Sequence, residues 1–234
     1  MERGVLSIVA TPIGNLEDIT LRALRVLREA DYILCEDTRI TGKLLKRYDI
    51  SKPLKRYDAH TNEQTHLDII DDLKSGKKIV LVSDAGTPGV SDPGVFLVRK
   101  IHEYNDGHPM SVIRLEAIPG PSAITAAFSI AGIVGNQFAF LGYAPQKKGR
   151  ETFFKSLSSY EIPVMFFEST HRIMKTLEAL KNLDENNTVN RTITVGRELT
   201  KMHEEMVSGT AGEVFNYFDT NKVHQKGEFV VMVH

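Results

Sequence analysis

Cysteine is almost absent from this chain, which excludes an internal disulfide. Cys35 is the only one in 234 residues, and its apolar neighbours, residues 32–34, predict a small buried hydrophobe rather than a catalytic thiol. No apolar run approaches the ~18 residues of a membrane span. The run that starts at Val5 is only about six residues long, too short for a signal peptide. We therefore expect no membrane association and a cytoplasmic location.

An excess of charge of either sign is also lacking. Lys and Arg number 29 and Asp and Glu number 30, so the formal net charge is −1 and no global field draws the chain to nucleic acid or membrane. Hydrophobic residues make up 41% and charged residues 25%, as in ordinary soluble domains. The length fits one large domain or two compact ones.

The sequence lacks the common motifs of metal and nucleotide chemistry. His60 and His66 are six positions apart, which suits no helical or tight-turn chelate, and neither Cys-x-x-Cys nor His-Glu-x-x-His occurs. No P-loop and no Gly-x-Gly-x-x-Gly is present. Ser91, Ser122 and Ser169 lack the Gly-x-Ser-x-Gly setting of a hydrolase. We expect no metal, and nicotinamide or flavin binding is disfavoured.

The first half of the chain alternates strand and helix patterns. Apolar runs predict strands at 5–10, 32–36, 79–83 and 112–115. Thr20 is expected to cap a helix whose apolar face is Leu21, Leu24, Leu27 and Ala30, and Asp92-Pro93 fits an N-cap and first helical position. This rhythm predicts a largely parallel sheet with helices on its faces.

The second half has fewer helices between its strands. Strands are expected at 162–167, 191–197, 205–207 and 228–233, and an exposed loop at 184–190. The fold class predicted is therefore α/β with two domains, a mainly parallel N-terminal sheet in residues 1–117 and a mixed C-terminal sheet in residues 118–234. The turn at 118–121 is the expected boundary, because Pro119 and Pro121 constrain the chain there.

Three expected strands run into loops rich in Gly and Pro. The longest loop is 83–94, and shorter ones lie at 11–15 and 119–122. Glycines let backbone N–H and C=O groups approach a ligand closely, and such loops at the carboxyl ends of parallel strands are where ligands bind in α/β sheets. Each loop alone is more typical of an ordinary turn; three together predict one composite pocket.

The side chains near these loops suit a zwitterionic ligand with an apolar ring. Asp84, Ser122 and Glu168 supply the polar groups, and the ring is expected among Val90, Ala123 and Phe167. The Asp84 carboxylate either accepts from an ammonium or ribose hydroxyl of the ligand or opens the loop as an Asx-turn, and the two roles are compatible.

Basic residues gather in two places. Seven lie between Arg39 and Arg56, where only Asp49 opposes them, and a second cluster holds Lys147, Lys148 and Arg150. Either these groups contact phosphates while the whole chain stays neutral, or they form a solvated helix face and a polar loop.

Seven motifs taken together are similar to those of one family. They are 10–16 (ATPIGNL), 36–39 (EDTR), 83–88 (SDAGTP) with 91–94 (SDPG), 119–122 (PGPS), 148–150 (KGR), 167–172 (FESTHR) and 197–201 (RELTK). In this order they resemble the tetrapyrrole-methylase superfamily of S-adenosylmethionine-dependent methyltransferases, and within it the branch that methylates a cytidine 2′-hydroxyl of bacterial 16S ribosomal RNA. They span nearly the whole chain.

This resemblance implies a methyl donor bound in a cleft between two α/β domains, a homodimer and no metal. It implies donor contacts from Asp84, Val90, Ser122, Ala123 and Phe167, with Pro12 and Leu199 nearby. Glu168 is expected among the donor contacts because it is one of the polar side chains named above for the pocket. It places Glu36, Asp37 and Arg39 near the transferred methyl or the RNA, and the loop with Lys147, Lys148 and Arg150 at the RNA.

The function expected is therefore methyl transfer to a ribose 2′-hydroxyl of 16S ribosomal RNA in the small ribosomal subunit. Glu36, Asp37 and His60 remain alternative bases. Two rival functions stay open: a precorrin or uroporphyrinogen C-methyltransferase, whose loop would read Gly-Asp-Pro, and a non-catalytic nucleotide- or RNA-binding module. The chain ends just after the last expected strand, whereas longer relatives carry a helical extension there, which puts RNA affinity and selectivity in question.

Overall fold

A computed structural model describes residues 4–92, 94–110, 112–185 and 191–234. The chain folds into two compact units, unit 1 (Met1–Ser122) and unit 2 (Ala123–His234), each with one five-stranded sheet. The domain boundary that the sequence predicts, after residue 117, stays a prediction. Strand β5 continues to Ile118, and the compact unit 1 extends to Ser122. No helix among the described residues has the length and apolarity that crossing a membrane requires.

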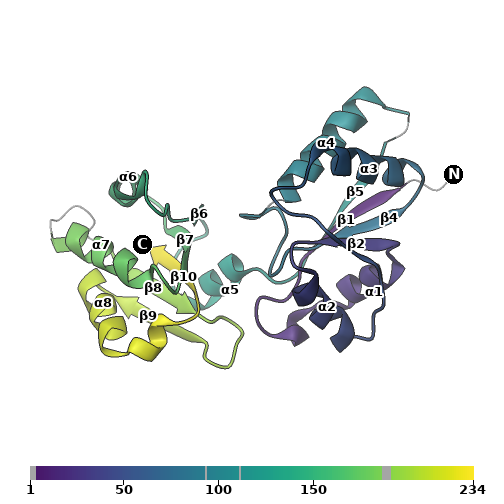
Figure 1. Ribbon diagram of the computed structural model, residues 1–234. Coiled ribbons are helices and arrows are strands. Elements are labelled where there is room, and N and C mark those ends of the chain that lie inside the picture. The colour runs from purple at the N-terminus through teal and green to yellow at the C-terminus, as the bar shows by residue number, and fades with distance from the viewer. Residues whose placement is uncertain (1–3, 93, 111, 186–190) are drawn as a thin grey trace. The chain divides into compact units, whose positions relative to one another are not determined.

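Unit 1 is a parallel sheet of order β3-β2-β4-β1-β5 (Figure 1). Its elements in chain order are β1 (Val5–Val9), η1 (Leu16–Asp18), α1 (Leu21–Glu29), β2 (Tyr32–Cys35), α2 (Thr38–Arg47), β3 (Leu54–Arg56), α3 (Glu63–Lys74), β4 (Lys78–Leu81), α4 (Gly94–Gly107) and β5 (Arg114–Ile118). Because the strands are parallel, the loops after β1, β4 and β5 leave from the same edge of the sheet.

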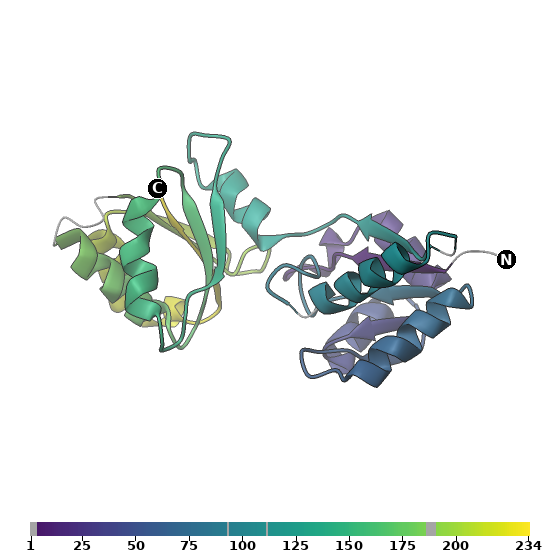
Figure 2. The same cartoon turned by 90° about the horizontal axis from the view of Figure 1, so that it is seen from above.

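Helices cover both faces of this sheet. Helices α1 and α2 lie on one face and α3 and α4 on the other (Figures 1 and 2). Alternate residues of one strand serve the two cores: Ile33 and Cys35 pack with α1 and α2, whereas Tyr32 and Leu34 pack with α3 and α4. A parallel strand buried on both sides reads as a continuous apolar run, which is why β2 and β4 could be found in the sequence.

Helix α1 begins as expected but buries a different face. The Thr20 hydroxyl accepts a hydrogen bond from the Ala23 backbone N–H, which confirms the cap. Leu21, however, is 86% exposed, and the buried residues are Ala23, Leu24, Val26 and Leu27. Leu21 was placed wrongly because the buried stripe is centred on Ala23 and Leu27, nearly opposite Leu21 on the helix.

Unit 2 has a mixed sheet of order β6-β7-β10-β8-β9, in which only the β6–β7 pair is parallel. Its elements are α5 (Ala123–Ile130), β6 (Ala139–Tyr143), α6 (Arg150–Ser156), η2 (Leu157–Ser159), β7 (Val164–Ser169), α7 (Ile173–Glu185), β8 (Ile193–Arg197), β9 (Glu205–Gly209), α8 (Ala211–Thr220), η3 (Lys222–Gln225) and β10 (Glu228–Val233). Its core holds Phe166 and Val231 from the sheet with Leu177 and Phe218 from α7 and α8.

The predicted fold class is confirmed, and the differences lie in single elements. The short strands β3 and β6 were not expected. In the expected loop at 184–190, Asp184 belongs to α7 and residues 186–190 lie outside the described part. Pro93 of the expected Asp92-Pro93 helix start also lies outside it.

Candidate functional site

The three Gly/Pro loops of unit 1 converge at the carboxyl edge of its sheet. Thr11 and Gly86 pair through two backbone bonds, of 2.9 and 3.0 Å, and the Thr11 hydroxyl donates to the Ser83 carbonyl. The Thr87 hydroxyl donates to the Pro121 carbonyl at 3.3 Å. These bonds join loops that are far apart in the chain and bring all three together. The composite ligand pocket predicted from them stays a prediction.

Left-handed backbone shapes the longest of these loops. Gly86 and Gly89 have φ of 78° and 85°, and Ser91 has φ of 66°. Glycine adopts this region without cost, but serine does not. The Asp92 carboxylate supports the turn by accepting bonds from the Gly89 and Gly94 backbone N–H groups. Val90 lies between these turns, and its apolar side chain is 39% exposed.

A cavity of about 320 Å³ opens beside the first two loops. Pro12 and Asp84 line it from the loops, and Ile40, Thr41 and Lys43 line it from α2. Ile40 and Thr41 were not predicted as site residues, and Lys43 was predicted only as one of the seven basic residues that either contact phosphates or form a solvated helix face. Ile40 and Lys43 could have been found from the sequence, because residues three positions apart share one face of a helix that begins at the predicted site.

Glu36 follows β2 and lines a narrow crevice with Tyr57, Pro88 and Asp92. Its partial burial raises the pKa of the Glu36 carboxyl, and the negative charges of Asp84 and Asp92 raise it further. A carboxylate shifted in this direction is a stronger base than an ordinary one, which is the property that a general base needs.

The Asp37 carboxylate, by contrast, is fixed by hydrogen bonds from Arg39. It accepts from the Arg39 backbone N–H at 2.8 Å and from the Arg39 guanidinium through both oxygens. These side-chain and backbone bonds lower the pKa of Asp37, and the same pairing raises the pKa of Arg39. The Asp37 backbone N–H donates to Asp84 Oδ1 at 3.0 Å, so the start of α2 is fastened to the loop after β4. Asp37 therefore suits positioning better than proton transfer.

The third alternative base, His60, is exposed beyond β3, where its backbone N–H donates to Asp58. Ser122 ends unit 1 and is half-buried. Ala123, Phe167 and Leu199 belong to unit 2. Ala123 is the first residue of α5, and Phe167 on β7 packs edge-on against Phe140 and near Tyr143.

Leu199 is held in a strained turn between β8 and β9. It is 6% exposed, and its neighbours Glu198 and Thr200 have φ of 48° and 65°. A β-branched residue in the left-handed region is rare, and such strain persists only where surrounding bonds enforce it. Lys201 supplies two of these bonds, donating to Glu198 and Glu228.

Glu168 is fully buried and its carboxylate is occupied by protein groups. It accepts from the Thr176 hydroxyl at 2.6 Å and from the Ser169 backbone N–H, and it pairs with Arg172 at 2.8 Å and Arg150 at 3.6 Å. Arg150 is 18% exposed and also donates to the Pro145 carbonyl. Glu168 is thus occupied in the interior of unit 2. Of the predicted RNA contacts, Arg150 pairs with Glu168 but also lines a cavity of about 550 Å³ with Lys147, and Lys147 and Lys148 are exposed.

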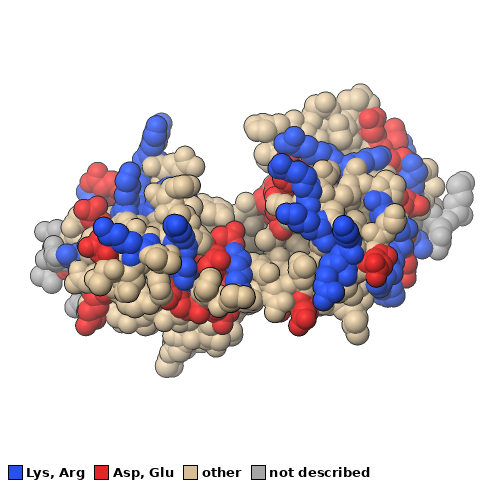
Figure 3. All heavy atoms as spheres, turned by 60° about the horizontal axis from the view of Figure 1, so that its bottom comes forward, with Lys and Arg blue, Asp and Glu red and all other residues tan. Residues whose placement is uncertain are grey.

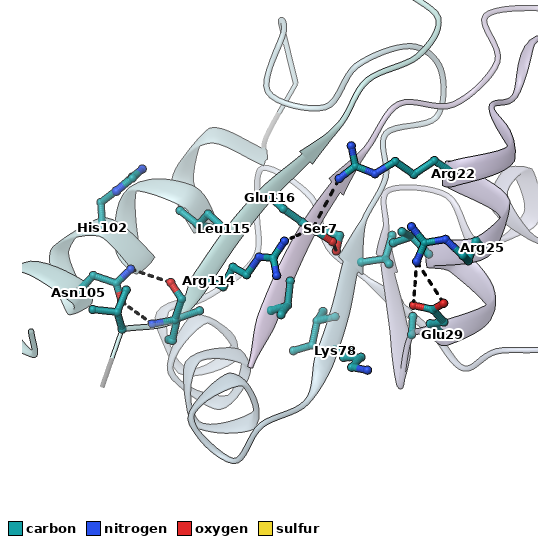
Figure 4. Close-up of a pocket in the computed structure, with 17 residues that line it drawn as sticks. Ser7, Arg22, Arg25, Glu29, Lys78, His102, Asn105, Arg114, Leu115 and Glu116 are labelled. Atoms are coloured by element: carbon teal, nitrogen blue, oxygen red, sulfur yellow. Dashed lines mark hydrogen bonds and ion pairs between the residues drawn. The ribbon is translucent and has the colours of Figure 1, made fainter. Parts of the chain in front are cut away.

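A larger cavity, about 830 Å³, lies at the other end of the unit 1 strands (Figure 4). Arginines of α1 and β5 surround it, but its carboxylates are occupied. Glu116 accepts from Ser7 at 2.7 Å and Arg114 at 3.0 Å, and Arg25 pairs with Glu29. It shares no residue with the convergent loops. Among the described residues, no group of three or more His, Cys, Asp or Glu is arranged to hold a metal.

The first unit is an α/β fold in which three Gly/Pro loops converge at the carboxyl edge of a parallel sheet. The family model of tetrapyrrole (corrin/porphyrin) methylases matches residues 5–214. The chain belongs to this family and is a methyltransferase.

Curated relatives match over the full chain. A protein of Thermotoga maritima named "Ribosomal RNA small subunit methyltransferase I" is 41% identical over 230 residues, which cover 98% of both chains. A protein of the same name from Bacillus subtilis is 39% identical over 99% of this chain and 75% of its own length.

Solved structures share the fold at lower identity. A cobalt precorrin-4 methyltransferase has a TM-score of 0.69 at 18% identity, covering 98% of this chain and 94% of its own. A uroporphyrin-III-C-methyltransferase from Thermus thermophilus has a TM-score of 0.63 at 18% identity, covering 99% and 94%. At this identity the likeness establishes the fold alone.

Proposed function

We propose that this methyltransferase uses S-adenosylmethionine to methylate a ribose 2′-hydroxyl of a cytidine in 16S ribosomal RNA of the small ribosomal subunit. The observation that carries the proposal is 41% identity, over 98% of both chains, to a relative named as a small-subunit ribosomal RNA methyltransferase. The named motifs support it, because they fall on the loops and strand ends described above.

The donor-binding residues of the proposal are chemically suited to this compound. Asp84 offers a carboxylate to an ammonium or ribose hydroxyl, and Val90 offers apolar contact to a ring. Pro12 and Ser122 of unit 1 and Ala123, Phe167 and Leu199 of unit 2 complete the proposed set, to which the sequence adds Glu168. Because the Glu168 carboxylate has four protein partners, we assign it the support of its strand rather than a direct contact.

S-adenosylmethionine supplies an electrophilic methyl group on a sulfonium, which is an intrinsically good leaving group. The protein's part is therefore mainly alignment, worth up to ~7–11 kcal/mol in favourable cases. We propose that Glu36 receives the proton of the acceptor hydroxyl, since its pKa is raised. Asp37 and Arg39 hold the start of α2 and the Asp84 loop in place as positioning residues.

Cytoplasmic location and a homodimer are further parts of the proposal. The first follows from a ribosomal acceptor, and the second from the usual assembly of the superfamily. Sedimentation of the purified chain tests the dimer directly: a single species at the monomer mass would remove that part.

The deciding experiment offers labelled donor with three acceptors in parallel: small ribosomal subunits, deproteinised 16S RNA and uroporphyrinogen III. We expect label in RNA, and mass mapping of nuclease fragments should place one methyl on a cytidine ribose. Label in the tetrapyrrole alone would establish the rival C-methyltransferase. Donor binding without turnover on any acceptor would indicate a binding module. The Glu36→Gln variant serves as the control for contaminating activity.

A further inference from the structure

We propose that Lys43, Lys46 and Arg47, named here the α2 basic face, bind phosphates of the RNA acceptor. The inference rests on the proposed function and names a second part of its substrate surface, distinct from the loop with Lys147 and Lys148. It is carried by the geometry of one helix, by its uncompensated charge and by its contact with the cavity beside the loops.

The three side chains share one side of α2. They are three and four positions apart, which places them side by side along a helix. The helix buries Thr41, Leu44 and Leu45 on the opposite side, against the sheet. Lys43, Lys46 and Arg47 are all exposed, so the basic groups are free to meet a large partner. Figure 3 shows Lys and Arg gathered on the side of unit 1 that carries α1 and α2.

Three of the four other basic residues between Arg39 and Arg56 pair with acidic side chains, whereas in the described part of the chain the three residues of the α2 basic face do not. Arg39 pairs with Asp37, Lys55 with Asp72 and Arg56 with Asp58. Among the residues that the structure describes, no ion pair joins the α2 basic face to an acidic side chain; Arg47 lies 6.0 Å from the Tyr48 ring. No Asp or Glu occurs within α2 itself. Asp49, two residues after Arg47, is the nearest acid in sequence.

Helix stability alone does not account for all three charges. Lys46 and Arg47 are in the last turn, where cations favour the helix C-terminus. Lys43 lies one turn earlier, beyond the reach of that effect, and its side chain is exposed. An exposed positive charge that has no intramolecular partner can pair with an anionic ligand.

The face is continuous with the site. Lys43 also lines the 320 Å³ cavity that Pro12, Asp84 and Ala85 border, and Ile40 and Leu16 add half-exposed apolar surface there. An RNA backbone held by Lys43, Lys46 and Arg47 would thus pass the rim of this cavity. Phosphate contacts position a nucleic acid without reading its sequence, so this face sets register and affinity rather than the choice of base.

The test measures RNA affinity as a function of salt. The variant Lys43→Gln/Lys46→Gln/Arg47→Gln is compared with wild type by fluorescence titration of 16S RNA and of small subunits over a series of KCl concentrations. Each lost phosphate contact should reduce the slope of log K against log salt by about 0.7 to 0.9, so we expect a reduction of about 2 to 3 units and at least tenfold weaker binding at low salt. Affinity for S-adenosylmethionine, by calorimetry, should not change in the double variant Lys46→Gln/Arg47→Gln, which leaves the cavity-lining Lys43 in place.

Two controls make the result specific. Lys78→Gln/Lys222→Gln/Lys226→Gln removes the same charge from exposed lysines of other elements, and should bind RNA within twofold of wild type. Lys43→Arg/Lys46→Arg/Arg47→Lys keeps the charge and should restore both affinity and slope. Equal weakening by both Gln variants would reduce the effect to net charge and overturn the inference, as would wild-type binding by the α2 variant.

A membrane surface is the competing partner for such a face. Sedimentation with phosphatidylserine vesicles that depends on the α2 basic face, with RNA binding unaffected, would therefore also overturn the inference. Failure of the proposed function is separate and visible in the wild type: in that case the unmodified protein itself leaves small-subunit RNA unmethylated. A wild type that methylates RNA beside an α2 variant that binds it normally refutes only the inference.

Discussion

At the scale of single residues, the candidate site depends on carboxylates with different environments. Glu36 lies among other acids, Asp37 is clamped by Arg39, and Asp84 accepts from the Asp37 backbone. The same functional group thus serves as base, as positioning residue and as ligand contact, according to its neighbours. Substitutions that keep the shape and change one property can separate these roles.

Asp84 offers the first such separation. Asp84→Asn retains an oxygen that can accept the Asp37 N–H, whereas Asp84→Ala loses both the oxygen and the charge. If the carboxylate contacts the donor, both variants should bind S-adenosylmethionine at least tenfold more weakly by calorimetry, equivalent to about 1.4 kcal/mol. Asp106→Asn, an exposed change on α4, should have no effect. Normal affinity in the Asn variant would restrict Asp84 to fastening α2.

Glu36 couples activity to pH-dependent stability. Because its pKa in the folded chain is raised above the ordinary 4.5, the folded state binds more protons than the unfolded state above that pH. The stability that Glu36 contributes therefore falls as the pH rises above about 4.5. We expect Glu36→Gln to lose less stability than wild type in urea unfolding as the pH rises above about 4.5, while kcat falls about 100-fold. Parallel pH profiles of the two proteins, or full activity, would contradict the assignment.

At the scale of elements, the hydrophobic pattern found most strands, and packing explains those that it missed. Strand β3 (Leu54–Arg56) has three residues, two of them basic and exposed, so it carries no alternation to detect. Strand β6 contains Gly142 at φ 68° and an irregular register between Phe140 and Tyr143. Both are edge strands, held by pairing with one neighbour rather than by buried side chains.

The site could be predicted where chemistry is local and not where it is distant. The loops were recognisable because Gly and Pro mark them, and the structure brings three of them together. Arg150 was grouped with Lys147 and Lys148 because they are neighbours in sequence. Its partner is Glu168, 18 positions away on another element, and no local pattern announces such an ion pair. Its assignment to RNA stays a prediction.

The turn that enters β10 gives a prediction at this scale. Gly227 has φ of 119°, and a Cβ there would lie 2.6 Å from Glu198 Cγ, whose carboxylate is fixed by Lys201. Gly227→Ala should therefore cost about 2–3 kcal/mol of unfolding free energy through strain and the displaced Glu198. Gly212→Ala, in α8 with nothing within 4 Å of the added Cβ, should be neutral or stabilise by about 0.5–1 kcal/mol. Equal stability of the two variants in urea would show that the turn adapts freely.

At the scale of the whole molecule, each of the two units has hydrophobic core residues of its own. Unit 1 is organised by α-helices on both faces of a parallel sheet, and unit 2 by a mixed sheet with a core of α6, α7 and α8. No residue is shared between the core of unit 2 and those of unit 1 in the described structure. A substitution that leaves a cavity in the core of one unit should therefore destabilise that unit first.

Helix α1 and strand β7 allow this to be tested with matched substitutions. Leu27 and Phe166 are fully buried in units 1 and 2, whereas Leu21, at the start of the same helix as Leu27, is 86% exposed. Leu27→Ala should cost about 2–5 kcal/mol and Phe166→Ala about 3–5 kcal/mol, with Leu21→Ala close to zero. In native-state hydrogen exchange, Leu27→Ala should accelerate the amides of β1, β2 and β4, and Phe166→Ala those of β7, β8 and β10. If either substitution accelerated both sheets equally, the two units would unfold as one cooperative block, because a shared transition is the only route by which a cavity in one core exposes the strands of the other.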